Sequence, residues 1–101
     1  MSFLSQYKAP QVVEVTLDDG SKHLIRKLSQ SDVEKLGKYA KDDTKQAEAL
    51  RHLVALGLAN PDGSRQIIDS QIGELADVPF DIIKQMAGEI SEFAGLIEKK
   101  A

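Results

Sequence analysis

The sequence predicts an α+β fold, mostly helical, in which an N-terminal β-hairpin is followed by about four α-helices. Near the N-terminus, two short runs rich in β-branched residues flank an Asp-Asp-Gly turn, the pattern of a hairpin. In the sequence after this hairpin, apolar residues recur at spacings of three and four, the period of amphipathic helices. A strongly apolar segment at 47–58 lies in the middle of the chain. We expect the other elements to pack around this segment.

The composition fits one folded domain. The chain has 101 residues, 42% hydrophobic and 29% charged, which is enough for one apolar core without metals or disulfides. We predict a single domain over 12–97, a loose N-terminal arm over 1–11 and a C-terminal tail over 98–101. The absence of cysteine is compatible with the cytoplasm, and the N-terminus does not read as a signal peptide. The central apolar segment is shorter than the roughly 20 residues that span a bilayer, so we expect no membrane association.

The predicted hairpin joins residues 12–17 to residues 22–28 through a turn at 18–21. Val13, Val15 and Leu17 alternate with polar residues, so we expect them on one buried face. A lone hairpin is only marginally stable in water. It must therefore pack on the helices or pair with another chain.

The first predicted helix begins near Ser29 and runs to about residue 40. Ser31 and Glu34 have the spacing of a capping box, and Ser29 with Asp32 offers a competing register. The polar run at 42–44 ends this helix and can cap the next one.

The central helix is apolar on nearly all sides. Its stripe positions include Leu50, Leu53, Val54 and Leu58. We expect Leu53 to be almost completely buried. The turn at 60–63 ends the helix, because Pro61 disfavours helical geometry before it and Gly63 can adopt positive φ.

Two further helices complete the predicted core. The shorter one begins at Asp69 or Ser70 and ends before Pro79, and the longer one runs from Pro79 to about Gly95. The face of the shorter helix consists of Ile68, Ile72, Leu75 and Ala76. The stripe of the longer helix consists of Phe80, Ile83, Met86, Ala87, Ile90, Phe93, Ala94 and Ile97. From these helices we assign Ile72, Leu75, Ile83, Met86 and Ile90 to the core.

The residue chemistry argues against an enzyme and against a metal centre. His23 and His52 have no acidic or histidine neighbour at the spacing of metal ligands, and zinc sites usually need at least three ligands. The acidic pairs, such as Asp18 and Asp19, lie at expected turns and helix caps. No glycine-rich phosphate loop or nucleophile elbow is present. We therefore expect no catalytic residue, no metal and no cofactor.

Nucleic-acid binding is the first alternative. The hairpin carries Lys22, His23, Arg26 and Lys27, and a hairpin beside helices could form the wing of a winged-helix arrangement. A recognition helix, however, needs several basic or amide side chains on one outward face, and no expected helix has them. Acidic and basic residues balance over 1–50, and the net charge of −3 arises in the second half. We expect no nucleic-acid partner. The runner-up functions are a small nucleic-acid-binding regulator and a stoichiometric inhibitor or antitoxin-like interaction module.

Several features follow one another in a recognisable order. They are the apolar run 49–58, the Asn60-Pro61-Asp62-Gly63 turn, the run 67–69, a short helix ending before Pro79, and a last helix ending in Gly95-Leu96. A Leu-Ser-x-x-Asp helix start at 28–32 precedes them. Over roughly residues 12–96, this order resembles that of phage tail assembly chaperones. The chain departs from the family at Asn60-Pro61, which stiffens a turn that the family more often makes without proline.

The resemblance implies a non-enzymatic factor, encoded by a long-tailed phage or a prophage and located in the host bacterial cytoplasm. It implies that the protein binds the tape measure protein, keeps it soluble and recruits tail tube protein, and that it is absent from the mature virion. Family members are often also made in a frameshifted, longer form. Homo-oligomerisation is left open.

For partner binding we expect apolar side chains on the arm and at the end of the last helix. They are Phe3, Leu4, Tyr7, Phe93, Leu96 and Ile97. An apolar groove formed by such residues can hold a partner helix through anchors at i, i+3, i+4 and i+7. The alternative for Phe93 and Ile97 is that they complete the core.

Overall fold

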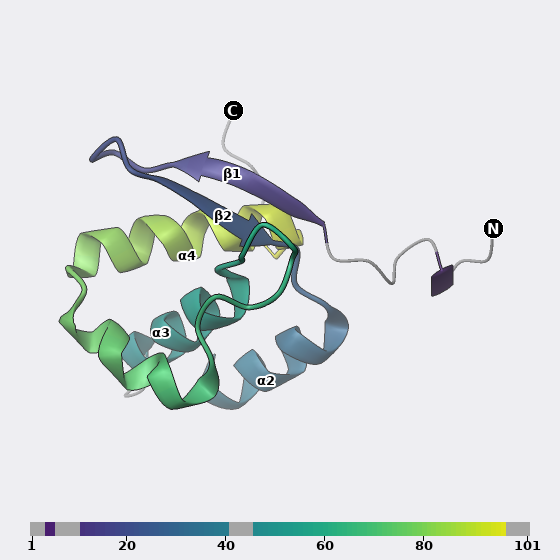
Figure 1. Cartoon of the computed structure of the whole chain (residues 1–101). Helices are drawn as coiled ribbons and strands as arrows, with labels where there is room; N and C mark the ends of the chain where they lie inside the picture. Colours follow the sequence, from purple (N-terminus) through teal and green to yellow (C-terminus); the bar gives the residue numbers. More distant parts are fainter. Residues whose placement is uncertain (1–3, 6–10, 41–45, 97–101) are drawn as a thin grey trace.

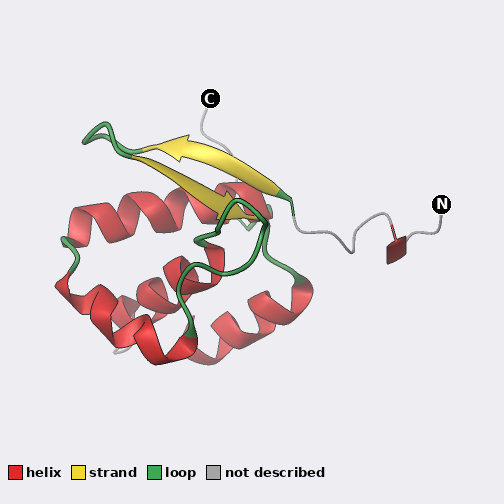
Figure 2. Ribbon diagram, viewed as in Figure 1, coloured by secondary structure: helices red, strands yellow, loops and turns green. Residues whose placement is uncertain are grey.

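The computed structural model describes residues 4–5, 11–40 and 46–96. It confirms an α+β, mostly helical fold in which an antiparallel hairpin precedes four helices (Figures 1 and 2). The elements, in chain order, are β1 (Val12–Thr16), β2 (Lys22–Arg26), α2 (Gln30–Ala40), α3 (Gln46–Gly57), the 3-10 helix η2 (Asp69–Asp77) and α4 (Phe80–Ala94). Helix α3 contacts α2, η2 and α4, and strand β2 contacts α4. Helix α3 therefore occupies the centre, as the apolar run at 47–58 predicts.

The second strand of the hairpin ends at Arg26, two residues earlier than predicted. Its register pairs Val13 with Ile25 and Val15 with His23, and Gly20 adopts a φ of 84° in the turn. Ile25 is completely buried and Leu17 is nearly so. Val13, which we expected on the buried face, is 41% exposed. It lies beside a groove along α4 that no described residue fills.

The central helix ends at Gly57, and the chain then continues as a short extended segment beside β2. Leu58 forms an antiparallel bridge with Ile25, and the backbone N–H of Ala59 donates to Leu24 O at 2.9 Å. The predicted turn follows, with Gly63 at a φ of 87°, which confirms the role expected for this glycine. The segment after α3 thus ties the helix to the hairpin.

The start of α2 uses the Ser29–Asp32 register, so the Ser31–Glu34 capping box that we ranked first is wrong. The backbone N–H of Asp32 donates to Ser29 Oγ at 3.2 Å, and the backbone N–H of Ser29 donates to Asp32 Oδ2 at 3.0 Å. Glu34 is exposed. Asp32 is favoured because it also pairs with Arg26 of β2, and folding of the hairpin onto the helices brings the two side chains within 3.1 Å. The polar run at 42–44 lies outside the described residues.

The core forms where α3, α4, η2 and the hairpin meet. Among the nine residues assigned to it from the sequence, Val54, Leu58, Ile72, Leu75, Ile83, Met86 and Ile90 are buried in one cluster. Leu50 and Leu53 are only partly buried at its edge. The expectation for Leu53 is therefore wrong. Burial in α3 is confined to its last turn, Val54 to Gly57, because β2 and α4 approach the helix there.

The period of η2 explains which of its side chains are buried. A 3-10 helix has three residues per turn, so Ile72, Leu75 and Val78 lie on one side and face the core. Ile68 and Ala76, which an α-helical period places on the same face, are exposed. In α4, Phe80 is also exposed, at 61%. It is the first residue of the helix, and the buried residues of α4 begin only at Ile83.

Two exposed aspartates at turns have a lowered pKa. Asp62 Oδ1 accepts hydrogen bonds from the hydroxyl of Ser64 at 2.6 Å and from its backbone N–H at 2.9 Å. Ser21 binds Asp19 in the same way. These bonds stabilise the charged form, with the hydroxyl as the larger cause, and place both pKa values below 3.8.

We expect the replacement Ser64→Ala to return the pKa of Asp62 towards 3.8 while the pKa of Asp19 stays low. A folded-state pKa below that of the unfolded chain contributes stability above the unfolded pKa, and this is lost as the pH falls through the folded pKa. Side-chain carboxyl NMR between pH 2 and pH 6 measures both titrations. An unchanged titration of Asp62 in this variant would contradict the assignment.

Candidate functional site

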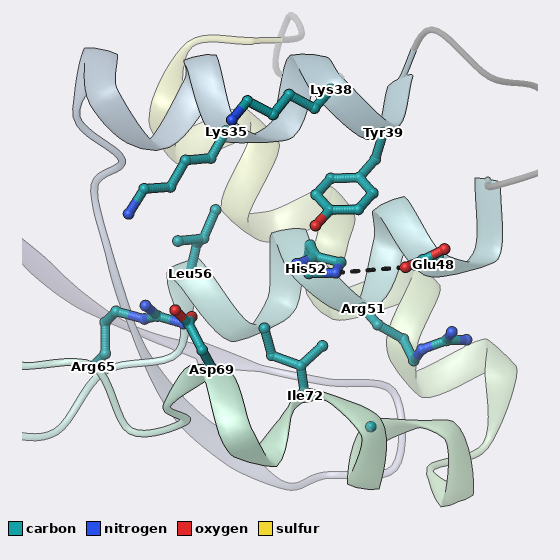
Figure 3. Close-up of a pocket in the computed structure, with 11 residues that line it drawn as sticks. Lys35, Lys38, Tyr39, Glu48, Arg51, His52, Leu56, Arg65, Asp69 and Ile72 are labelled. Atoms are coloured by element: carbon teal, nitrogen blue, oxygen red, sulfur yellow. Dashed lines mark ion pairs between the residues drawn. The ribbon is translucent and has the colours of Figure 1, made fainter.

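A concave feature lies between α2, α3 and η2, and we call it the basic pocket. Its volume is about 570 Å³. Helix α2 contributes Lys35, Lys38 and Tyr39, and α3 contributes Glu48, Arg51, His52 and Leu56. Arg65 of the loop and Asp69, Ile72 and Gly73 of η2 close the other side (Figure 3). Four cationic side chains and one histidine thus face two carboxylates across an apolar floor.

One end of the basic pocket is formed by the aromatic side chains of Tyr39 and His52. The rings of Tyr39 and His52 stack with their centroids 3.9 Å apart and an interplanar angle of 18° (Figure 3). His52 Nε2 lies 3.9 Å from Glu48 Oε1, one helical turn earlier. The sequence interpretation that His52 has no acidic neighbour at the spacing of metal ligands overlooked Glu48, although no group of three such side chains forms around the pair among the described residues. The spacing of four residues in α3 was the signal that could have found this pair.

The other end of the pocket is built around Arg65. Its Nε donates to Ala55 O at 3.4 Å, which ties the side chain to the last turn of α3. Its Nη2 lies 3.1 Å from Asp69 Oδ1, within the range of an ion pair. This nitrogen is buried and donates no well-aligned hydrogen bond to any described residue. Arg65 Nη2 is therefore paired with Asp69 by charge, without an aligned hydrogen bond among the described residues.

The second concave feature is a groove between the hairpin and the last turns of α4, and we call it the hairpin groove. It has a volume of about 380 Å³ and is lined by Val13, Glu14, Val15, Ile25, Glu89, Glu92 and Phe93. Its apolar floor and acidic rim suit an apolar segment flanked by basic residues. Leu96, 44% exposed, lies just after α4, beyond Gly95, whose φ of 78° ends the helix.

The six residues expected to bind a partner lie in different environments or outside the described residues. Phe93 lines the hairpin groove and is partly buried against the core, and its role in partner binding stays a prediction. Leu96 is 44% exposed just beyond α4, and Leu4 is 78% exposed. Phe3, Tyr7 and Ile97 lie outside the described residues. The sequence interpretation missed Val13, because the alternation in β1 placed it in the core.

The basic residues of the hairpin are largely held by other contacts. Arg26 donates to Leu56 O at 2.7 Å and to Asp32 Oδ2 at 3.1 Å. Lys27 Nζ lies 5.6 Å from the centre of the Phe93 ring, and His23 Nε2 lies 2.9 Å from Ser21 Oγ. Only Lys22 of the four has no such contact among the described residues. The hairpin therefore offers little free charge for a nucleic-acid wing.

Within the part of the chain that the structure describes, no group of three or more histidine, cysteine or acidic side chains is placed to hold a metal ion. A search of the same residues finds no helix long and apolar enough to cross a membrane.

The described elements form the fold of a phage tail assembly chaperone. In a comparison with solved structures, the chain matches the tail assembly chaperone of bacteriophage HK97 with a TM-score of 0.66. The match covers 91% of this chain and 86% of the HK97 protein, at 13% sequence identity. No protein-family model and no curated protein sequence matches the chain. The resemblance drawn from the sequence is thus confirmed at the level of the fold.

Proposed function

We propose that this protein is a non-enzymatic tail assembly chaperone that binds the tape measure protein in the host cytoplasm and keeps it soluble. The observation that carries the proposal is the fold shared with the HK97 chaperone over nearly the whole of both chains. Because the match covers 91% of this chain, the similarity is not confined to a few helices.

We place the partner in the hairpin groove. Val13 is a large apolar side chain exposed to solvent, and it lines the groove together with the partly buried Phe93. Leu96, which is also exposed, follows the end of α4. Exposed apolar side chains that cluster at a groove are a common feature of protein-binding surfaces. The tape measure protein is expected to be long and helical, so one of its helices can insert apolar anchors between the hairpin and α4. Glu89 and Glu92 on the rim favour basic residues beside those anchors.

Co-expression tests this function. We expect this chain to raise the soluble yield of the tape measure protein from the same phage or prophage. The complex should survive high salt, because burial of apolar surface is not screened by ions. Replacement of Val13 by serine should weaken the complex, and the matched replacement Ile68→Ser should leave it intact, because Ile68 is also exposed but precedes η2 and does not line the groove.

A tape measure protein that stays insoluble would overturn the proposed function. Equal loss of binding in both variants would overturn only the placement in the hairpin groove. Retention of the chain on duplex DNA at physiological salt, lost at moderately higher salt, would favour the nucleic-acid-binding alternative instead.

A further inference from the structure

We propose that the basic pocket is a second binding site, and that it takes carboxylate side chains from an acidic peptide segment of a partner chain. This inference goes beyond the proposed function, because it concerns a different surface and holds for any partner with such a segment. The hairpin groove has an acidic rim, whereas the basic pocket has an excess of cations. The two surfaces therefore select for opposite charge.

Most cations of the pocket have no ion pair within the described part of the chain. Among the described residues, no acidic side chain lies within ion-pair distance of Lys35, Lys38 or Arg51. Each of them lines the pocket, and Figure 3 shows Lys35 and Arg65 reaching from opposite walls. A carboxylate placed between these walls meets donors from two separate elements, as in charge-assisted recognition.

Arg65 supplies the donor best prepared for this role. Its guanidinium is fixed by Ala55 O, and its buried Nη2 has no well-aligned acceptor among the described residues. Its ion-pair partner Asp69 is 83% exposed and so is weakly held. Asp69 therefore occupies the position that an incoming carboxylate would take, and it competes with the ligand.

The pocket fits a peptide better than a nucleic acid. Leu56 and Ile72 supply an apolar floor, which suits a leucine or valine between acidic residues. The Tyr39 ring is stacked on His52, so that face is not free to stack on a base. The net charge of −3 also disfavours a long polyphosphate chain.

The test is an NMR titration of the full chain with a capped peptide, Glu-Glu-Leu-Leu-Glu-Glu. We expect saturable shifts of backbone amides around Lys35, Arg51 and Arg65, and none with the matching Gln-Gln-Leu-Leu-Gln-Gln peptide. Lys35→Gln or Arg65→Gln should weaken binding by about tenfold, the effect of one lost charge-assisted hydrogen bond. The control Lys22→Gln removes an exposed charge from the hairpin and should change affinity by less than about twofold.

Asp69→Asn gives the sharpest result, because it should tighten peptide binding by removing the competing carboxylate. Its side chain is exposed, so this variant keeps the proposal testable even where Arg65→Gln fails to fold. No saturable shifts, or shifts outside the pocket, would overturn the site. Tighter binding of inorganic phosphate or of a twelve-nucleotide single strand than of the peptide would overturn the assignment to an acidic peptide.

Discussion

The replacement Gly57→Ala is expected to destabilise the protein by about 1–3 kcal/mol or more, although alanine normally favours a helix over glycine. A Cβ built at Gly57 would lie 2.6 Å from both Cγ1 and Cγ2 of Ile90 and closer still to its Cδ1. Ile90 is completely buried and β-branched, so its Cγ atoms cannot move aside without disturbing the core. The last turn of α3 can approach α4 only because position 57 has no side chain.

Chemical denaturation measures this effect as a lower midpoint with an unchanged slope. The matched control is Gly37→Ala in α2, where a new Cβ meets nothing within 4 Å. We expect the control to stabilise the protein by about 0.5–1 kcal/mol through helix propensity. A Gly57→Ala variant as stable as the control would mean that α3 and α4 do not cross at this point.

Replacement of Asp32 by alanine is expected to cost about 3–5 kcal/mol, the usual penalty for removing one partner of a buried ion pair. Asp32 is 7% exposed, and its Oδ2 accepts from Arg26 Nη2 at 3.1 Å and from the backbone N–H and the hydroxyl of Ser29, each at 3.0 Å. Without Asp32, the Arg26 guanidinium keeps only its bond to Leu56 O. The variant thus loses a helix cap and leaves a partly buried cation without its carboxylate partner.

Thermal and urea unfolding of this variant provide the measurement, and the control is Glu34→Ala. Glu34 is the exposed acid of the competing capping register, so its loss should change the free energy of unfolding by less than about 0.5 kcal/mol. A folded domain of this size typically holds about 5–15 kcal/mol in total, so Asp32→Ala should be partly unfolded in mild denaturant. A larger effect from Glu34→Ala than from Asp32→Ala would contradict the observed cap.

Local sequence signals predicted the elements well. The alternation at 12–17, the periodic stripe of α4, and the glycines at positions 20 and 63 each act through neighbours a few residues away. Such features depend on backbone preferences and on local hydrogen bonds, and not on contacts with distant segments. The α+β class and the order of the elements therefore followed from the sequence alone.

The local signals failed where a distant contact decided the outcome. Two serine caps had the correct spacing for α2, and Arg26 on β2 selected the one that contains Asp32. The hydrophobic period could not show that η2 is a 3-10 helix, so Ile68 was assigned to the wrong side. Leu53 was assigned to the deep core because the stripe of α3 does not reveal which turn of the helix is covered.

The candidate sites also divide into features that the local sequence indicates and features that depend on tertiary contacts. The sequence by itself indicated the exposed Leu96 and the groove residue Phe93, because both lie on or just beyond one amphipathic helix. Only the tertiary structure brought Val13 beside Phe93, and only it placed Lys35, Arg51 and Arg65 around one pocket. Periodicity reports which side of an element is apolar, whereas a pocket depends on how three elements, separate in the chain, pack against one another.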